Sequence, residues 1–238
     1  MNSFMASLWR VFPRTETRSA RPAWAGTGLC FCLSLAMGAC TATPQESFER
    51  GLQFEDGTGV PKDDGRAAEL YTKACDGGHA QACARLGVLV SESRGVAWDE
   101  AREEALYTKA CDGGYIQGCF DAGRVFEFGL RVRGPDKKRA QAFYTKACDK
   151  GHTDGCARLG FLFLGPLPMS PDRDEARAAA LLTKACDNGH AEGCTSLGKL
   201  FQYGRGVSKD EARAATLYTK GCDGGVIVAC FNLRPPDM

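Results

Sequence analysis

The chain has 238 residues, of which 44% are hydrophobic and 25% charged, values that are ordinary for a globular protein. Its 30 Lys and Arg residues nearly balance its 29 Asp and Glu residues, which excludes the clustered basic excess of a nucleic-acid-binding protein. The 13 cysteines are many for this length, so we expect either an oxidising compartment or bound metal.

The N-terminal segment has the pattern of an export signal. Four arginines precede an uncharged, apolar stretch over residues 23–39, which is long for a signal core and short for a membrane span. Small residues then precede Cys40, as in the lipobox of bacterial lipoproteins. We therefore predict a lipoprotein-type signal peptide over residues 1–39, lipid attachment to Cys40 and a short linker over residues 40–46. Ordinary signal cleavage nearby is the alternative, and both place the mature protein in the cell envelope (periplasm or outer membrane) or make it secreted.

After the linker the chain repeats itself. The motif Tyr-Thr-Lys-Ala-Cys-Asp-Gly-Gly, first seen at residues 71–78, returns four times with small changes. Its cysteines, at positions 75, 111, 148, 186 and 222, stand 36, 37, 38 and 36 residues apart. A second cysteine follows each of them by eight positions. This period predicts a solenoid of two-helix units over residues 47–232 (about five repeats), followed by a tail over residues 233–238.

The first helix of each unit is predicted to begin at an aspartate and to end just after the first cysteine. The aspartate can accept hydrogen bonds from the first turn, and the glycines after the cysteine end the helix because glycine enters the left-handed region without strain. The starting aspartates are Asp63, Asp99, Asp136, Asp174 and Asp210.

The second helix is predicted to run from about the second cysteine past a recurring glycine. Glycine within a helix costs about 1 kcal/mol relative to alanine, so its recurrence indicates a close approach of two helices. These glycines are Gly51, Gly87, Gly123, Gly160 and Gly198.

The combined pattern resembles a known family. A-C-D-G-G-H-x-x-x-C-x-x-L-G, then G-x-G-V, then D-x-x-R-A-x-x-L-Y-T-K-A-C is similar to Sel-1-like repeats, and the paired cysteines resemble the cysteine-rich Hcp subfamily of exported bacterial proteins. The resemblance covers residues 47 to about 231. It implies an all-α fold, a right-handed α/α superhelical solenoid related to tetratricopeptide (TPR-like) repeats, and a role as adaptor or scaffold. It also implies an alternative, because the Hcp subfamily is labelled β-lactamase and its members are described as penicillin binders with weak hydrolytic activity.

Ten cysteines form five pairs at the spacing Cys-x7-Cys. Eight residues of one continuous helix would span about 12 Å, too far for a bridge, but the glycines let the chain double back so that two helix ends meet. We therefore expect the disulfides Cys75–Cys83, Cys111–Cys119, Cys148–Cys156, Cys186–Cys194 and Cys222–Cys230. A zinc site is the alternative, but it needs four ligands at closer spacing, and no unit supplies four. We expect no metal and no cofactor.

No catalytic residue is predicted. Ser196 and Lys199 match the S-x-x-K string of serine β-lactamases, but S-D-N and K-T-G do not occur in the sequence. Both residues occupy repeat positions that vary from unit to unit. Whether the chain is an enzyme therefore stays open, and the alternative function is a weak Hcp-type β-lactamase or penicillin-binding protein acting on β-lactams or peptidoglycan fragments.

A binding face is expected where the repeats differ. The positions two and five after each second cysteine vary in charge and lie on one helix face, because they are three residues apart. These residues are Arg85, Val88, Asp121, Arg124, Arg158, Phe161, Ser196 and Lys199. We predict an exported scaffold that binds a protein or peptide partner here, binds no nucleic acid, and contacts the membrane only through its lipid anchor. A merely solvated face would have the same pattern.

Overall fold

The computed structural model describes residues 42–129, 134–165 and 173–233. The chain divides into two units, Met1–Thr41 and Ala42–Met238, and the described residues all belong to the second. The predicted signal peptide and Cys40 therefore lie outside the described residues. The described residues form eleven α-helices and no strand. The helices are α1 (Pro44–Asp56), α2 (Asp64–Asp76), α3 (Ala80–Ser91), α4 (Glu100–Asp112), α5 (Ile116–Phe128), α6 (Lys137–Asp149), α7 (Thr153–Leu164), α8 (Glu175–Asp187), α9 (Ala191–Tyr203), α10 (Glu211–Asp223) and α11 (Ile227–Asn232).

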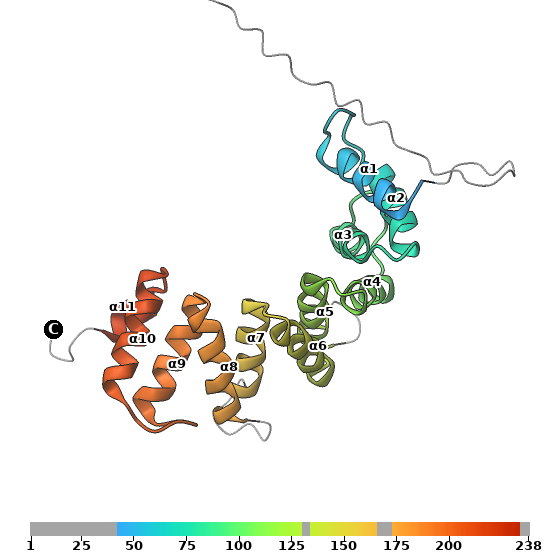
Figure 1. The fold of residues 1–238 in the computed structure, drawn as a ribbon. Coiled ribbons are helices and arrows are strands. Elements are labelled where there is room, and N and C mark those ends of the chain that lie inside the picture. Colours follow the sequence, from blue (N-terminus) through green and yellow to red (C-terminus); the bar gives the residue numbers. More distant parts are fainter. Residues whose placement is uncertain (1–41, 130–133, 166–172, 234–238) are drawn as a thin grey trace, which may run out of the picture. The chain divides into compact units, whose positions relative to one another are not determined.

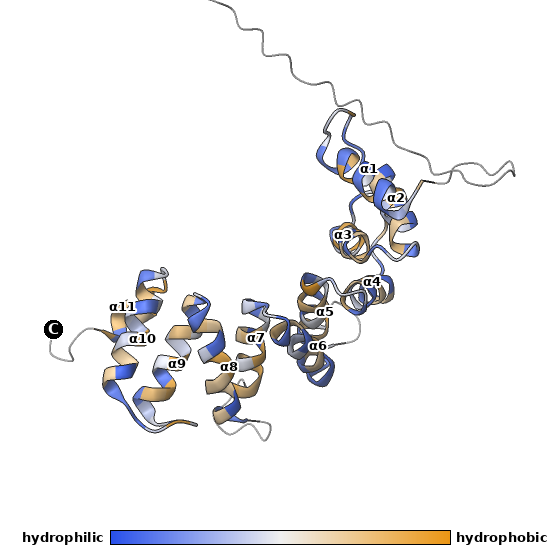
Figure 2. Ribbon diagram, viewed as in Figure 1, coloured by the Kyte–Doolittle hydropathy of each residue, from blue (hydrophilic) through white to orange (hydrophobic). Residues whose placement is uncertain are grey.

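The helices alternate between two kinds, and each packs mainly on its neighbours in the chain (Figure 1). We call α2, α4, α6, α8 and α10 the A helices, which end near the first cysteine of a pair. The others are the B helices, and all of them except the short α11 carry the recurring glycine. This consecutive packing confirms the predicted all-α solenoid. Each helix buries an apolar side against its neighbours and turns a polar side outward (Figure 2).

The predicted aspartates cap all five A helices. Each accepts a hydrogen bond from the backbone N–H of the arginine three residues later, at 2.8 to 3.0 Å. Four of these arginines, Arg66, Arg139, Arg177 and Arg213, also make side-chain contacts. Arg139, for example, pairs with Asp136 at 2.8 Å and lies over the ring of Phe126. The recurrence of aspartate and arginine is thus explained by helix starts.

The B helices α3, α5, α7, α9 and α11 begin three residues before the second cysteine, earlier than predicted. In three of them a histidine caps the helix: His79, His152 and His190 accept a backbone N–H at Nδ1, at 3.2, 3.1 and 2.9 Å. Because Nδ1 accepts, the imidazole proton of His79 lies on Nε2, which donates to Gln45 at 2.9 Å. Histidine is not a usual capping residue, which is why the sequence pattern placed these starts too late.

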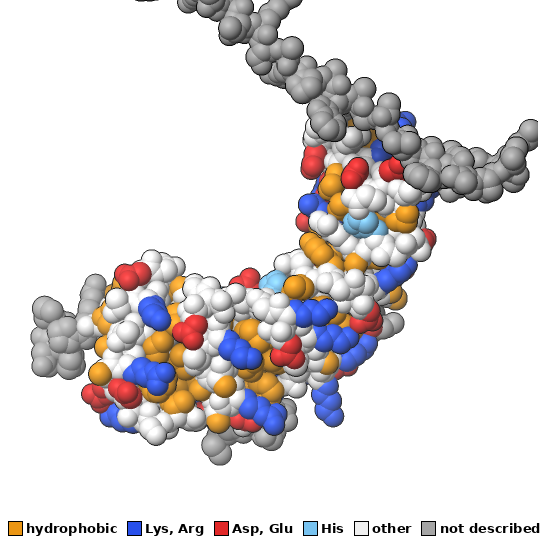
Figure 3. All heavy atoms as spheres, viewed as in Figure 1, with side chains coloured by type: hydrophobic (Ala, Val, Ile, Leu, Met, Phe, Trp, Pro, Cys, Tyr) orange, Lys and Arg blue, Asp and Glu red, His pale blue; other side chains and the backbone are white. Residues whose placement is uncertain are grey.

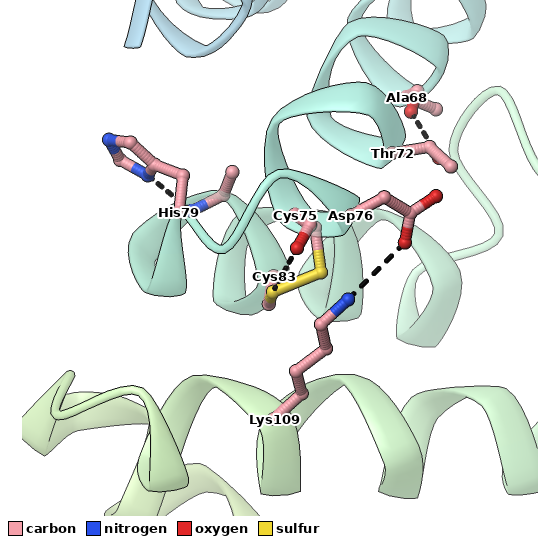
Figure 4. Close-up of a disulfide and its surroundings, with 8 residues drawn as sticks. Ala68, Thr72, Cys75, Asp76, His79, Cys83 and Lys109 are labelled. Atoms are coloured by element: carbon pink, nitrogen blue, oxygen red, sulfur yellow. Dashed lines mark hydrogen bonds and ion pairs between the residues drawn. A yellow bond between two sulfur atoms is a disulfide. The ribbon is translucent and has the colours of Figure 1, made fainter. Parts of the chain in front are cut away.

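All five predicted disulfides are formed, with Cα–Cα distances of 4.4 to 4.8 Å. Each joins the last turn of an A helix to the first turn of the following B helix, as Figure 4 shows for Cys75 and Cys83. The turn between them reverses at Gly78, whose φ is +91°, whereas Gly77 has φ −75°. Lys109 of the next A helix reaches back to Asp76 at 3.3 Å, which ties neighbouring A helices together. No group of three or more potential metal ligands occurs within the described ranges.

Each of the B helices α1, α3, α5, α7 and α9 packs closely on the next A helix at its recurring glycine, as predicted. A Cβ on Gly51, Gly87, Gly123 or Gly198 would lie 2.5 to 2.8 Å from a ring atom of a buried tyrosine. The tyrosines are Tyr71, Tyr107, Tyr144 and Tyr218. At Gly160 the neighbour is Leu182, at 2.9 Å. The glycine therefore leaves room for a large side chain of the facing helix.

The loop after α3 closes on the start of α2 through an arginine clamp. Arg94 donates from Nε and Nη2 to the two carboxylate oxygens of Asp64, at 3.1 and 2.8 Å. Arg205 makes the equivalent contact with Glu175, at 2.7 Å. The hydrogen bond from Arg94 lowers the pKa of Asp64 below its ordinary 3.8. The clamp therefore stabilises the fold only while Asp64 is ionised.

A pH dependence follows from this clamp. Asp64→Asn should lower the free energy of unfolding at neutral pH, because it removes the carboxylate that Arg94 holds. A lowered pKa contributes stability above pH 3.8, and this contribution is lost as the pH falls through the lowered value. Urea unfolding from neutral to acidic pH should show the two proteins converging. A constant difference at every pH would contradict a charge-dependent role.

The array begins earlier in the chain than the sequence predicted. Helix α1 begins at Pro44, within the segment predicted as a linker, and Thr43 caps it in a capping box with Glu46. Within the ranges that the structure describes, no helix combines the length and apolar character that crossing a bilayer requires.

Candidate functional site

The predicted binding face is only partly a surface. Arg85, Arg124 and Lys199 are exposed, and Arg158, Asp121 and Ser196 are half-buried. Val88 and Phe161 instead pack against the core, Val88 beside Tyr107 and Phe161 beside Cys186. The part of this face that a partner can reach is therefore mainly basic.

Two of these cations pair with carboxylates of the preceding B helix. Arg85 lies 3.7 Å from Glu55, which is 7% exposed, and Arg158 lies 3.8 Å from Glu127. The same carboxylates accept the buried hydroxyl groups of Tyr71 and Tyr144, each at 2.6 Å. Burial and this hydrogen bond raise the pKa of Tyr71 well above its ordinary value. Sequence spacing alone did not reveal these tyrosine–glutamate–arginine sets.

The members of these sets vary together along the chain. Where tyrosine becomes Leu182, the position of the glutamate is taken by Leu164, which packs against the same cluster. Where the glutamate becomes Gln202, it still accepts from Tyr218 at 2.6 Å, and burial raises the pKa of this tyrosine to about 12. Much of the variation at the predicted face therefore follows from packing between neighbouring helices. The sequence signal that could have revealed these sets is the separation of 16 or 17 residues between each tyrosine and the residue that accepts its hydroxyl group.

The junction of α3, α4 and α5 departs from this pattern. Ser91 stands where three other junctions have glutamate or glutamine and one has Leu164, and its hydroxyl donates to the carbonyl of Val88 at 2.9 Å. A cavity of about 250 Å³ lies here, lined by Tyr107, Asp121 and Phe128 among others. Burial raises the pKa of Asp121, which accepts from Gln117 at 3.1 Å. This small pocket has both polar and aromatic walls.

A larger groove runs over successive A–B turns, and we call it the turn groove. It has a volume of about 680 Å³ and draws on residues of α5, α7, α9 and the α8–α9 and α10–α11 turns. Arg158 and Phe161 of the predicted face line it, together with the exposed carboxylates Asp154 and Glu192. Glycine backbone at Gly224 and Gly225 forms one edge. Such a groove offers charges of both signs and exposed backbone groups to an extended ligand.

Charge on the surface is mixed. On the face that Figure 3 shows, acidic and basic side chains are interspersed with apolar ones. Ser196 is half-buried and Lys199 exposed on α9, where both are ordinary helix positions between the core residues Thr195, Leu197 and Leu200.

Comparison with known proteins identifies the repeats. The model of the Sel1 repeat matches five consecutive segments, residues 50–79, 80–115, 116–152, 153–190 and 191–226. No curated protein matches the chain.

Solved structures share the fold. The protective antigen c5321 of uropathogenic Escherichia coli strains, which displays an SLR fold, is 28% identical with a TM-score of 0.73. The match covers 80% of this chain and 40% of that protein, so this chain spans less than half of its length. A Sel1 repeat protein from Oxalobacter formigenes is 23% identical with a TM-score of 0.67, over 80% of this chain and 74% of that one. Helicobacter pylori cysteine rich protein B is 28% identical over 57% of this chain and 95% of its own, with a TM-score of 0.44.

Proposed function

The chain belongs to the Sel1 repeat family, and from this premise we propose that it holds a protein or peptide partner in the turn groove and on the adjoining exposed part of the predicted face. Sel1 repeat proteins generally mediate protein interactions. The observation that carries the proposal is the turn groove, because it spans successive repeats and combines Arg158 with Asp154 and Glu192. A partner segment with charges of both signs would complement it.

The rigid packing of the helices around the turn groove supports a role in binding a partner. The disulfides and the tyrosine–glycine contacts fix each helix against its neighbours before any partner arrives. A preformed surface loses less conformational entropy on binding, which raises affinity for a given contact area. Half-buried Phe161 offers an apolar floor in the groove, and the charged residues at its rim set the orientation of the partner.

Site-specific photo-crosslinking tests the proposal. A photoreactive residue in place of Glu192, at the turn groove, or of Lys199, on the predicted face, should crosslink one and the same partner in cells. The matched control is Glu69 on α2, which is also exposed but lies outside both surfaces. Crosslinks from Glu69 alone, or from none of the three positions, would contradict the proposal.

The location of the protein is part of the proposal. Five disulfides in a chain of this size indicate an oxidising, extracytoplasmic environment. We propose that the segment before Cys40 directs export and that a lipid on Cys40 holds the protein at the membrane. The sequence pattern before Cys40 supports this assignment.

Replacement of the proposed lipid acceptor gives a direct test. Cys40→Ser should move the protein from the membrane fraction to the soluble envelope fraction, because the acyl chains supply the membrane affinity. Circular dichroism should stay unchanged, since Cys40 precedes the first helix. Identical partition of both proteins would show that Cys40 carries no lipid.

The hydrolase alternative gains no supporting observation, and we do not propose it.

A further inference from the structure

The five disulfides differ in how far solvent can reach them. The cysteines of the first four pairs are buried, and none is more than 5% exposed. Cys222 and Cys230 of the fifth pair are both half-buried. A thiolate must approach a sulfur atom directly to attack it, so access separates the fifth bridge from the other four.

The helix that carries Cys230 is also weakly held. Helix α11 has six residues, whereas the other ten helices have 12 or 13. Val226 gives it no side-chain cap, and Ile227 and Val228 are 70% and 51% exposed. Of its residues only Ala229 is buried. A short helix with so little burial opens locally at low free-energy cost, which exposes the sulfur atoms further.

We propose that Cys222–Cys230 is a thiol–disulfide exchange site for a dithiol reductant, and that its reduction releases α11 from α10. One thiolate of the reductant attacks a sulfur of the bridge, forms a mixed disulfide and displaces the other cysteine as a thiolate. The second thiolate of the reductant then attacks the mixed disulfide and closes the reductant's own disulfide. The two protons of the dithiol end on Cys222 and Cys230, so the protein gains two thiols and the reductant is oxidised.

Opening this bridge has a consequence for the turn groove. The turn over residues 224–226, which lines the groove, lies between the two cysteines. While the bridge is closed, both ends of this turn are fixed. Reduction frees one end and loosens that wall. This consequence rests on the proposed function, whereas the exchange site itself does not.

Graded reduction of the folded protein tests the site. The protein is exposed to low concentrations of dithiothreitol at neutral pH, quenched with iodoacetamide and digested for peptide mass spectrometry. Cys222 and Cys230 should be alkylated about tenfold faster than the other eight cysteines, or faster still, because the buried pairs react only after a larger opening. Earlier reduction of another pair, or one rate for all five, would overturn the proposal.

Two double-cysteine variants test whether loss of the bridge releases α11 alone or loosens the whole array. Cys222→Ser with Cys230→Ser should raise amide hydrogen exchange in residues 224–233 and leave the earlier helices unchanged. The matched variant, Cys111→Ser with Cys119→Ser, should raise exchange in both α4 and α5. Unchanged exchange in α11 would show that the bridge does not hold it. If reduction is selective but Glu192 crosslinks no partner even in the oxidised protein, the exchange site stands and the proposed function fails.

Discussion

Complete reduction of the five disulfides should leave the chain unable to keep its helices at room temperature. Each bridge joins cysteines eight positions apart, and closing such a loop stabilises by about 2–3 kcal/mol in the chain-entropy model. Five such contributions match the whole free energy of unfolding of a typical domain, about 5–15 kcal/mol. The two helices that a bridge joins otherwise meet through small side chains, as at Gly118 and Ala110, and these contacts provide little to replace the bridge.

Circular dichroism checks this expectation. The protein is reduced and alkylated in denaturant, diluted into buffer and compared with a sample that goes through the same cycle without reductant. Only the unreduced sample should regain its helical signal. Intact mass before alkylation should rise by ten hydrogen atoms, two for each of the five bridges. Recovery of full helicity without the bridges would mean that packing alone holds the array.

Gly123→Ala should destabilise the protein by about 1–3 kcal/mol, although alanine is the better helix former. The added Cβ would lie 2.5 Å from ring atoms of Tyr144. The ring cannot easily move aside, because its hydroxyl group donates to Glu127 at 2.6 Å and the side chain is fully buried. The new methyl group therefore forces α5 and α6 apart.

The neighbouring residue supplies the control. Arg124 is exposed on the same helix, so Arg124→Ala should change the free energy of unfolding by less than about 0.5 kcal/mol. Gly123→Ala combined with Tyr144→Leu should be less destabilised than the sum of the two single variants, since a smaller side chain leaves room for the methyl group. Urea unfolding is measured for the parent and for the four variants. Stability of Gly123→Ala within about 0.5 kcal/mol of the parent would refute close packing at this glycine.

The sequence predicted features that depend on short spacing. Asp63 and its equivalents are followed by the N–H groups they cap, and Cys75 and Cys83 are joined by a single turn. Gly123 could be assigned to a close contact between helices because glycine destabilises a helix, and its recurrence at this position therefore indicates a packing role. Such assignments need only the helix period and the properties of one residue type, and both can be read from the amino-acid sequence.

Contacts between helices far apart in the sequence could not be predicted in the same way. Arg85 was assigned to a variable surface because its repeat position changes in charge, but it faces Glu55, 30 residues earlier. Phe161 had the right helix spacing for the same surface, but it packs partly against the core and also lines the turn groove. A helical period tells which residues share a face, but not what lies opposite that face. The turn groove, which joins residues from three repeats, was invisible for the same reason.

The alternation of bridged and unbridged junctions has a mechanical consequence. A pulling force applied along the chain cannot lengthen the segment between Cys75 and Cys83, because the disulfide carries the load. The segment between Cys83 and Cys111, with its Gly87–Tyr107 contact, has no covalent shortcut and must yield first. Each repeat would therefore extend by less than its full contour length, and the bridged turns would remain as closed loops along the stretched chain.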